Sequence, residues 1–211
     1  MNPESWKQRK GSLQLHNNVV MTKNEAIIDS IKSLLDAYHA LSAQSNKNET
    51  DLNALRYLIG QSIRQYDIPL ENHHVSQAAL VRWKCLSKDK IEKYHYRDQV
   101  KCDNLSKPTR FKLFKGASKN GTYRRLVPNN YFIFRDMFHE DHVIPVSLIL
   151  NAMVSLNPIS RTSIEELLNS MHLCVLLKDE DRHIGKTSGR TLNFKDIIKN
   201  VYNANGITLA P

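Results

Sequence analysis

Apolar side chains recur at helical spacing through the first part of the chain. Between residues 22 and 41 isoleucine, leucine and tyrosine return every three or four positions, and Thr22-x-x-Glu25 forms a capping-box pattern in front of them. A second such run, from about residue 51 to 66, is expected to end just before Ile68-Pro69, because the residue that precedes a proline resists helical geometry. Shorter runs at 76–86 and 90–100 predict two further helices.

The second part of the chain alternates short β-type runs with helical patterns. The expected elements are a strand at 131–134, a helix from about Ser147 to Leu156, a helix opened by Thr162-x-x-Glu165, a strand at 172–177, a charged helix at 178–183 and a last helix at 193–205 stopped by Gly206. We therefore predict an α+β protein that is predominantly helical. Its expected parts are an N-terminal helical region, 1–100, and a second region, 101–211, with a basic hairpin or loop, a small α+β core and a C-terminal helix.

The charge of the chain points to an anionic partner. The 211 residues carry a formal net charge of +9, and the sequence pI is near 9.5. A surplus of this size favours nucleic acid through long-range attraction and counterion release. A basic protein without a polyanionic partner is the alternative.

Much of the positive charge lies between residues 101 and 135, where Asp103 is the lone acid. Turn residues at 116–121 predict a β-hairpin with a cationic face, although a solvated loop has the same composition. The residues expected to contact phosphates are Lys112, Lys115, Lys119, Arg124, Arg125 and Arg135.

Three cysteines are too few and too widely spaced for a four-cysteine zinc site or a disulfide framework. The polar start of the chain lacks the apolar segment of a secretory signal, and no stretch approaches the roughly 18 apolar residues of a membrane span. A cytoplasmic location is expected. His73 and His74 follow an acid, but adjacent residues point in different directions, so we expect a capping or surface role there.

Two segments combine acids and histidines at the ends of expected strands. The first is Phe138-His139-Glu140-Asp141-His142-Val143-Ile144-Pro145, and the second is Leu173-Cys174-Val175-Leu176-Leu177 followed by Lys178-Asp179-Glu180-Asp181-Arg182-His183. Their acids also have an ordinary interpretation, as surface groups at a strand end and as a helix N-terminal turn stabilised by the helix dipole.

These segments resemble the HNH family of ββα-metal finger nucleases. Asp141-His142-Val143-Ile144-Pro145 is similar to the family's first-strand motif, residues 172–177 occupy the second strand, and residues 178–183 the metal-binding helix. The chain reads His, His, Asp where the family reads His, Asn, His. The similarity covers about a quarter of the chain, and the zinc-binding cysteine pairs of many family members are absent.

The resemblance implies a catalytic site. His142 is expected to be the general base, since a neutral imidazole accepts a proton near neutral pH. Asp141 and Asp181 are the expected oxygen ligands of one divalent ion, Mg²⁺ or Mn²⁺, with His183 as a reserve ligand. His172 either replaces the family asparagine or is structural, and Arg182, Arg135 and Glu140 could position the metal or the phosphate.

The function that follows is metal-dependent endonucleolytic cleavage of double-stranded DNA, as in restriction or defence. A palindromic target would imply a homodimer. Two alternatives stay open: a non-catalytic nucleic-acid-binding module or regulator, and a helical interaction protein whose charge is incidental.

Overall fold

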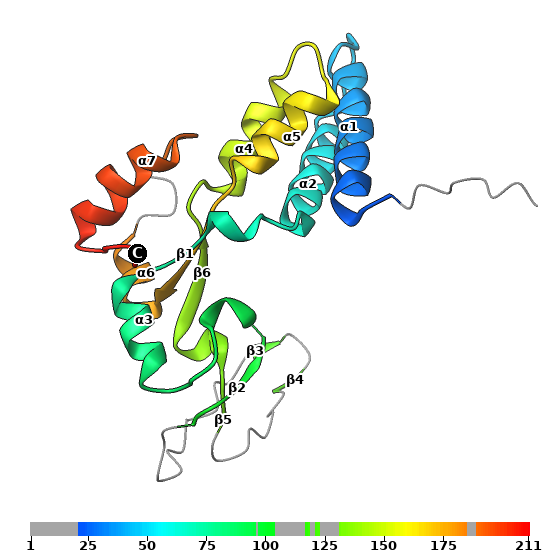
Figure 1. Ribbon diagram of the computed structural model, residues 1–211. Coiled ribbons are helices and arrows are strands. Elements are labelled where there is room, and N and C mark those ends of the chain that lie inside the picture. The colour runs from blue at the N-terminus through cyan, green and yellow to red at the C-terminus, as the bar shows by residue number, and fades with distance from the viewer. Residues whose placement is uncertain (1–20, 96, 104–116, 119–120, 123–130, 185–188) are drawn as a thin grey trace, which may run out of the picture.

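The computed structural model describes residues 21–95, 97–103, 117–118, 121–122, 131–184 and 189–211 (Figure 1). The fold is mixed α+β and predominantly helical, as the sequence predicts. The helices are α1 (Lys23–Ser42), α2 (Glu49–Gln65), α3 (Gln77–Lys84), α4 (Val146–Val154), α5 (Arg161–Asn169), α6 (Lys178–His183) and α7 (Phe194–Ile197). The strands are β1 (His73–Val75), β2 (Gln99–Lys101), β3 (Ala117–Ser118), β4 (Gly121–Thr122), β5 (Tyr131–Ile133), β6 (Phe138–His142) and β7 (Leu173–Leu177).

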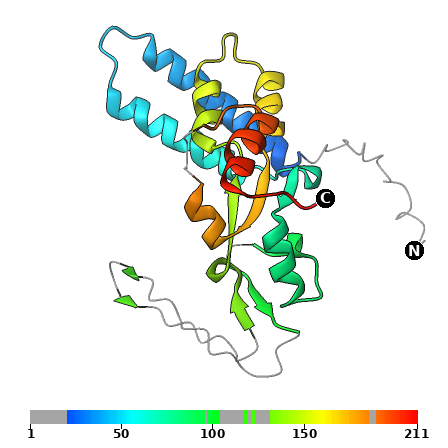
Figure 2. The ribbon, with the colours of Figure 1, turned by 90° about the vertical axis from the view of Figure 1, so that its left-hand side faces the viewer.

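Four helices pack together at one end of the molecule (Figures 1 and 2). The predicted capping box starts α1, since the Thr22 side chain accepts from the Glu25 backbone N–H and the Glu25 side chain accepts from Thr22. α1 and α2 form a hairpin against α4 and α5, so the helical part includes segments from both sides of residue 100. α5 begins after a Ser160 cap rather than at the predicted Thr162, because the Ser160 hydroxyl accepts from the Ser163 N–H.

A three-stranded sheet with the order β1-β7-β6 separates two hydrophobic cores. β7 pairs parallel to β1 and antiparallel to β6. Side chains alternate along β7, so Cys174 and Leu176 enter the first core, which is shared with the helical end and α7, while Val175 enters the second.

The second core is built around Trp83 of α3. Its ring lies 5.6 Å from Phe138 and 6.0 Å from Phe134, centroid to centroid, in edge-on contacts. Trp83 is only 2% exposed, so truncation to alanine should cost about 3–5 kcal/mol of folding stability. This core fixes the start of β6 against α3.

The helix predicted at 90–100 is wrong. The described residues of this stretch form a 3₁₀ turn at Ile91–Lys93 (η2) and then the strand β2, which pairs with β5. Val100 is fully buried beside Phe132, and Asp98 accepts from the His95 N–H, so tertiary pairing overrides the helical pattern.

Short helical turns form several of the described connections. Further 3₁₀ turns occur at Leu70–Asn72 (η1), Phe134–Asp136 (η3) and Asn203–Asn205 (η5), and α7 continues as a π-helical turn at Ile198–Tyr202 (η4). Gly206 has a φ of 74° and ends this last helical segment, as predicted. Within the described ranges, no helix has the length and hydropathy needed to cross a membrane.

Candidate metal centre

β6, β7 and α6 form a strand–strand–helix unit in which β7 runs directly into the helix. β6 and β7 pair through all five of their positions, from Phe138 opposite Leu177 to His142 opposite Leu173. The Lys178 N–H donates to the Met137 carbonyl at 3.1 Å, which joins the start of α6 to the entry of β6. The unit therefore brings the acidic turn of α6 next to the first strand.

His139 and Asp141 lie on one face of β6, because alternate residues of a strand point to the same side. Asp181 of α6 completes a group in which one ligand atom from each residue lies within 4.8 Å of the others. His139 Nε2 is 3.5 Å from Asp181 Oδ1, and these two side chains are 37% and 36% exposed. A small ion could reach both the nitrogen and the oxygens from solvent.

The position of Asp181 depends on its neighbour Glu180. Glu180 Oε2 accepts from the Leu177 N–H at 2.8 Å and from the Ser76 hydroxyl at 2.6 Å. Ser76 is fully buried and also caps α3. One carboxylate thus ties the first turn of α6 to β7 and α3, and this allows Asp181 to face β6.

Asp141 is held by two residues from the C-terminal segment. Its Oδ2 accepts from Arg190 Nη1 at 2.8 Å and from the Tyr202 hydroxyl at 2.5 Å. The Arg190 side chain is 2% exposed and that of Asp141 is 14% exposed. Burial, together with the nearby charge of Asp141, raises the pKa of Tyr202, so its hydroxyl stays protonated and donates.

The sequence-predicted ligands Asp141 and Asp181 are brought together, and the predicted reserve ligand is not. His183 and Arg182 lie at the exposed end of α6, where His183 Nδ1 contacts the Asp179 carbonyl and Arg182 pairs with the Asp179 carboxylate. Neither belongs to the cluster of His139, Asp141 and Asp181.

The predicted general base, His142, lies on the opposite face of β6 from His139 and Asp141, because strand alternation continues through position 142. Burial is the main cause that lowers the pKa of His142, opposed by the charge of Asp141. Its Nδ1 is buried and has no hydrogen-bond partner among the described residues. The structure therefore separates His142 from the two carboxylates that the sequence groups with it.

His172 lies in a stack of rings with His74 of β1 and Phe194 of α7. Its Nδ1 is 3.0 Å from Nε2 of His74, and its ring lies 4.0 Å from that of Phe194. The surface or capping role expected for His74 is wrong, since β1 pairs with β7 and places this ring against His172 and Phe194. Burial and the neighbouring His74 lower the pKa of His172 to about 4.

Of the predicted phosphate contacts, only Arg135 is described. It lies in η3, beside Asp136. Burial raises the pKa of Asp136, and the positive charges of Lys178 and Arg135 partly oppose this shift. Lys112, Lys115, Lys119, Arg124 and Arg125 lie outside the described residues.

Sequence reasoning missed three residues of this centre: His139, Arg190 and Tyr202. His139 could have been found, because it stands two positions before Asp141 on an expected strand and must share its face. Arg190 and Tyr202 carry no such signal, since they are 49 and 61 residues away from Asp141 in the chain.

The donor set suits a divalent cation. It offers one imidazole nitrogen and two carboxylate oxygens, a combination that transition ions and Mn²⁺ accept. The two carboxylates outnumber the one positive charge of Arg190 beside them, so this position favours a cation. Comparisons with protein-family models, curated proteins and solved structures find no match to this chain.

Proposed function

We propose that the chain is a metal-dependent phosphodiesterase of the ββα-metal type that cleaves nucleic acid, with DNA as the substrate to test first. The observation that carries the proposal is the group of His139, Asp141 and Asp181, whose ligand atoms lie within 4.8 Å of one another on a strand–strand–helix unit. The resemblance to HNH nucleases implies the two carboxylate ligands Asp141 and Asp181, with His142 as the histidine. The histidine of this group is instead His139.

The residues of the centre have separate tasks in this proposal. Asp141 and Asp181 supply the negative charge that holds a divalent ion, and His139 supplies a nitrogen ligand, which favours Mn²⁺ or another transition ion over Mg²⁺. A bound ion of this kind lowers the pKa of a water molecule and stabilises negative charge on a phosphate. In this proposal His139 is a metal ligand, which differs from the general-base role that the resemblance implies for His142.

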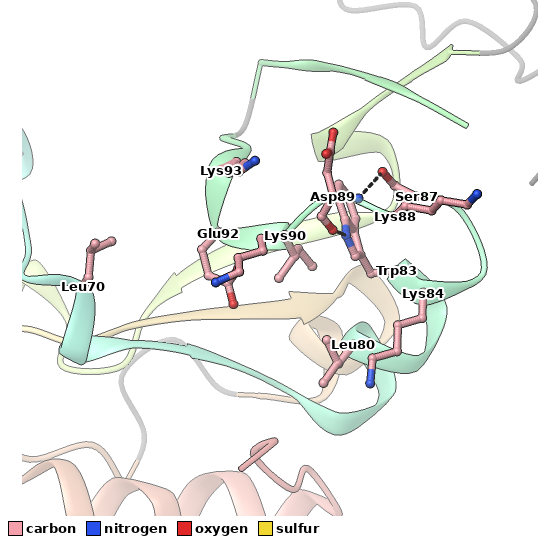
Figure 3. Close-up of a pocket in the computed structure, with 11 residues that line it drawn as sticks. Leu70, Leu80, Trp83, Lys84, Ser87, Lys88, Asp89, Lys90, Glu92 and Lys93 are labelled. Carbon is pink, nitrogen blue, oxygen red and sulfur yellow. Dashed lines mark hydrogen bonds between the residues drawn. The ribbon is translucent and has the colours of Figure 1, made fainter. Parts of the chain in front are cut away.

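A second feature supports an anionic substrate. A surface pocket of about 730 Å³ lies between α3 and η2 (Figure 3). Its apolar part is formed by Leu70, Leu80, Trp83 and Ile91. Around it, four lysines, Lys84, Lys88, Lys90 and Lys93, outnumber the acids Asp89 and Glu92. We call these four lysines the lysine rim. Their excess positive charge is suited to phosphate groups and adds to the charge of the whole chain.

One observation favours a different function, a non-catalytic nucleic-acid-binding module. The ion pair between Arg190 and Asp141 is buried, and a carboxylate already paired with a cation attracts a metal less strongly. In that alternative, the pair is structural and the chain binds DNA without any need for divalent ions.

The test compares Asp181→Asn with the matched control Asp179→Asn. Both acids lie on α6, but Asp179 pairs with Arg182 outside the cluster. Purified wild-type and variant proteins are incubated with plasmid and with single-stranded DNA, with Mn²⁺, Mg²⁺ or EDTA, and the products are separated on a gel. Mn²⁺ affinity is measured in parallel by calorimetry.

We expect cleavage by the wild type with Mn²⁺ and none with EDTA. Asp181→Asn should lower Mn²⁺ affinity and cleavage by more than about 100-fold, because loss of an outer partner of a metal ligand already costs about 10–100-fold. Asp179→Asn should retain both. DNA binding without cleavage, and no Mn²⁺ binding by the wild type, would refute the nuclease proposal in favour of the binding module.

A further inference from the structure

Two residues of the C-terminal segment, 189–211, donate hydrogen bonds to the Asp141 carboxylate. This segment lies outside the part of the chain that resembles the HNH family. We propose that Arg190 and Tyr202 are positioning residues that hold Asp141 Oδ2, so that Oδ1 is the oxygen presented to the metal. This inference rests on the proposed function, since it assumes that Asp141 is a metal ligand. It makes residues 189–211 part of the centre.

Arg190 fixes the end of β6 as well as the carboxylate. Its Nη1 donates to Asp141 Oδ2 at 2.8 Å and is also 2.9 Å from the His142 carbonyl and 3.0 Å from the Val143 carbonyl. Because one buried guanidinium spans the side chain and the backbone, the carboxylate cannot rotate without breaking its hydrogen bond to this group.

The approach of Arg190 requires a glycine just before it. Gly189 has a φ of 72°, in the left-handed region that disfavours residues with a Cβ. A Cβ there would meet Val201 Cγ2 at 3.4 Å, an ordinary van der Waals distance, so the positive φ and not a lack of space favours glycine. Gly189 thus lets the chain turn tightly against the helix that carries the second positioning residue.

Tyr202 reaches Asp141 from a π-helical turn. The turn spans Ile198–Tyr202, and Tyr202 is fully buried, with its hydroxyl 2.5 Å from Asp141 Oδ2. Turns of this type are rare and frequently occur at functional sites. From the last position of this turn, the Tyr202 hydroxyl reaches the Asp141 carboxylate.

The two donors leave one oxygen of the carboxylate available. Both hydrogen bonds to the Asp141 side chain go to Oδ2, and among the described residues Oδ1 has no hydrogen-bond partner. His139 and Asp181 lie on the same side of β6 as Asp141. A carboxylate fixed in this way can offer Oδ1 to an ion without first losing rotational freedom.

Tyr202→Phe is the clean test, because it removes one hydrogen-bond donor and keeps the ring and the charge. Substitution of Arg190 is ambiguous, since loss of its positive charge strengthens metal binding while loss of its hydrogen bonds weakens it. The matched control is Tyr66→Phe, which removes a hydroxyl bonded at 2.6 Å to Asn169 Oδ1, outside the metal centre.

Mn²⁺ affinity is measured by calorimetry for the wild type, Tyr202→Phe and Tyr66→Phe at a temperature where circular dichroism shows all three folded. We expect Tyr202→Phe to bind Mn²⁺ about 10-fold more weakly, as is typical for loss of an outer partner of a ligand, and Tyr66→Phe to bind like the wild type. The electron paramagnetic resonance spectrum of bound Mn²⁺ should change for Tyr202→Phe alone.

The possible failures can be told apart. A wild type that does not bind Mn²⁺ overturns the proposed function and this inference with it. A wild type and Tyr202→Phe with affinities within twofold of each other overturn the positioning role alone. An equal loss in Tyr66→Phe also overturns it, because the effect would then be general to the fold.

Discussion

Histidines lie in two places on the same small sheet, and the side chains around them differ. On β6, His139 faces two carboxylates, and its side chain is 37% exposed. At β1 and β7, His74 and His172 face each other and the ring of Phe194. No acid belongs to the second group in the described part of the chain, and burial lowers the pKa of both of its histidines.

The difference shows how the environment decides what an imidazole can do. Beside carboxylates, His139 gains an electrostatic setting that attracts a cation, so its nitrogen can serve as a ligand. Between aromatic rings, His172 is kept neutral, and its role is to pack α7 against the sheet through Phe194. The His139, Asp141 and Asp181 group is thus a candidate for chemistry, and the stack of His74, His172 and Phe194 is a structural contact.

The largest expected effect separates the two groups directly. His139→Ala should weaken Mn²⁺ binding by more than about 100-fold, because it removes a ligand and not only an outer partner. His172→Ala should leave Mn²⁺ affinity within twofold of the wild type and lower the melting temperature, because it opens a space beside Phe194. Calorimetry and thermal unfolding measure the two effects.

His142→Gln is the control for this comparison. His142 lies next to Asp141 in the sequence but on the other face of β6, so its replacement should keep Mn²⁺ affinity within twofold of the wild type. If the affinity instead falls as far as in His139→Ala, the loss is not specific to the cluster, and the assignment of His139 as a ligand loses its support.

Much of the fold follows from periodicity and capping in the sequence. The α1 capping box, the α2 boundary before Ile68-Pro69, and the succession of β6, β7 and α6 all have local signals that the structure reproduces. The helix expected at 90–100 does not form, because residues 99–101 pair as a strand with β5, which lies about 30 residues further along the chain. Val100 pairs with Phe132 across β2 and β5, and such pairing has no local signal.

The candidate site likewise has residues that local sequence motifs predict and contacts that only tertiary packing creates. Asp141 and Asp181 could be found from the sequence, since each lies in a local motif that resembles a known family. The side chains that surround Asp141 and His172 could not be predicted from the sequence. His74 reaches His172 across 98 residues, and Arg190 reaches Asp141 across 49 residues, so tertiary packing alone separates the cluster from the stack.

A smaller effect concerns the dependence of stability on pH. The pKa of His172 is about 4 in the folded protein and near 6.5 in an unfolded chain. Between these values the unfolded state binds more protons, so His172 contributes its full stability above about pH 6.5, and this contribution is lost as the pH falls toward 4. Thermal unfolding at pH 7.0, 6.0 and 5.0 (~0.1 M salt, EDTA present) measures this loss.

His172→Phe is the matched variant for the pH experiment, because it keeps a ring in the stack and removes the histidine whose pKa is lowered to about 4, while His74 stays in both proteins. Its melting temperature should fall less between pH 7.0 and 5.0 than that of the wild type. His142 also has a lowered pKa, but it is present in both proteins and cancels in the difference. Parallel curves for the two proteins would show that the stack does not control the acid sensitivity.

The smallest expected effect concerns the lysine rim and compares its part in DNA binding with that of lysines elsewhere on the molecule. Lys88 and Lys93 come from the pocket beside α3, whereas Lys32 and Lys47 lie at the helical end, where they pair with Asp36 and Glu49. The double variant Lys88→Gln/Lys93→Gln should reduce the salt dependence of binding to a short DNA duplex by roughly one unit of slope for each phosphate that a lysine no longer neutralises. Lys32→Gln/Lys47→Gln changes the net charge equally and should leave the slope unchanged.

Fluorescence anisotropy over a series of salt concentrations, with EDTA present, measures both slopes. Because the two double variants have the same net charge, equal slopes would mean that DNA is attracted by the charge of the whole chain, and the pocket would then have no special part in binding.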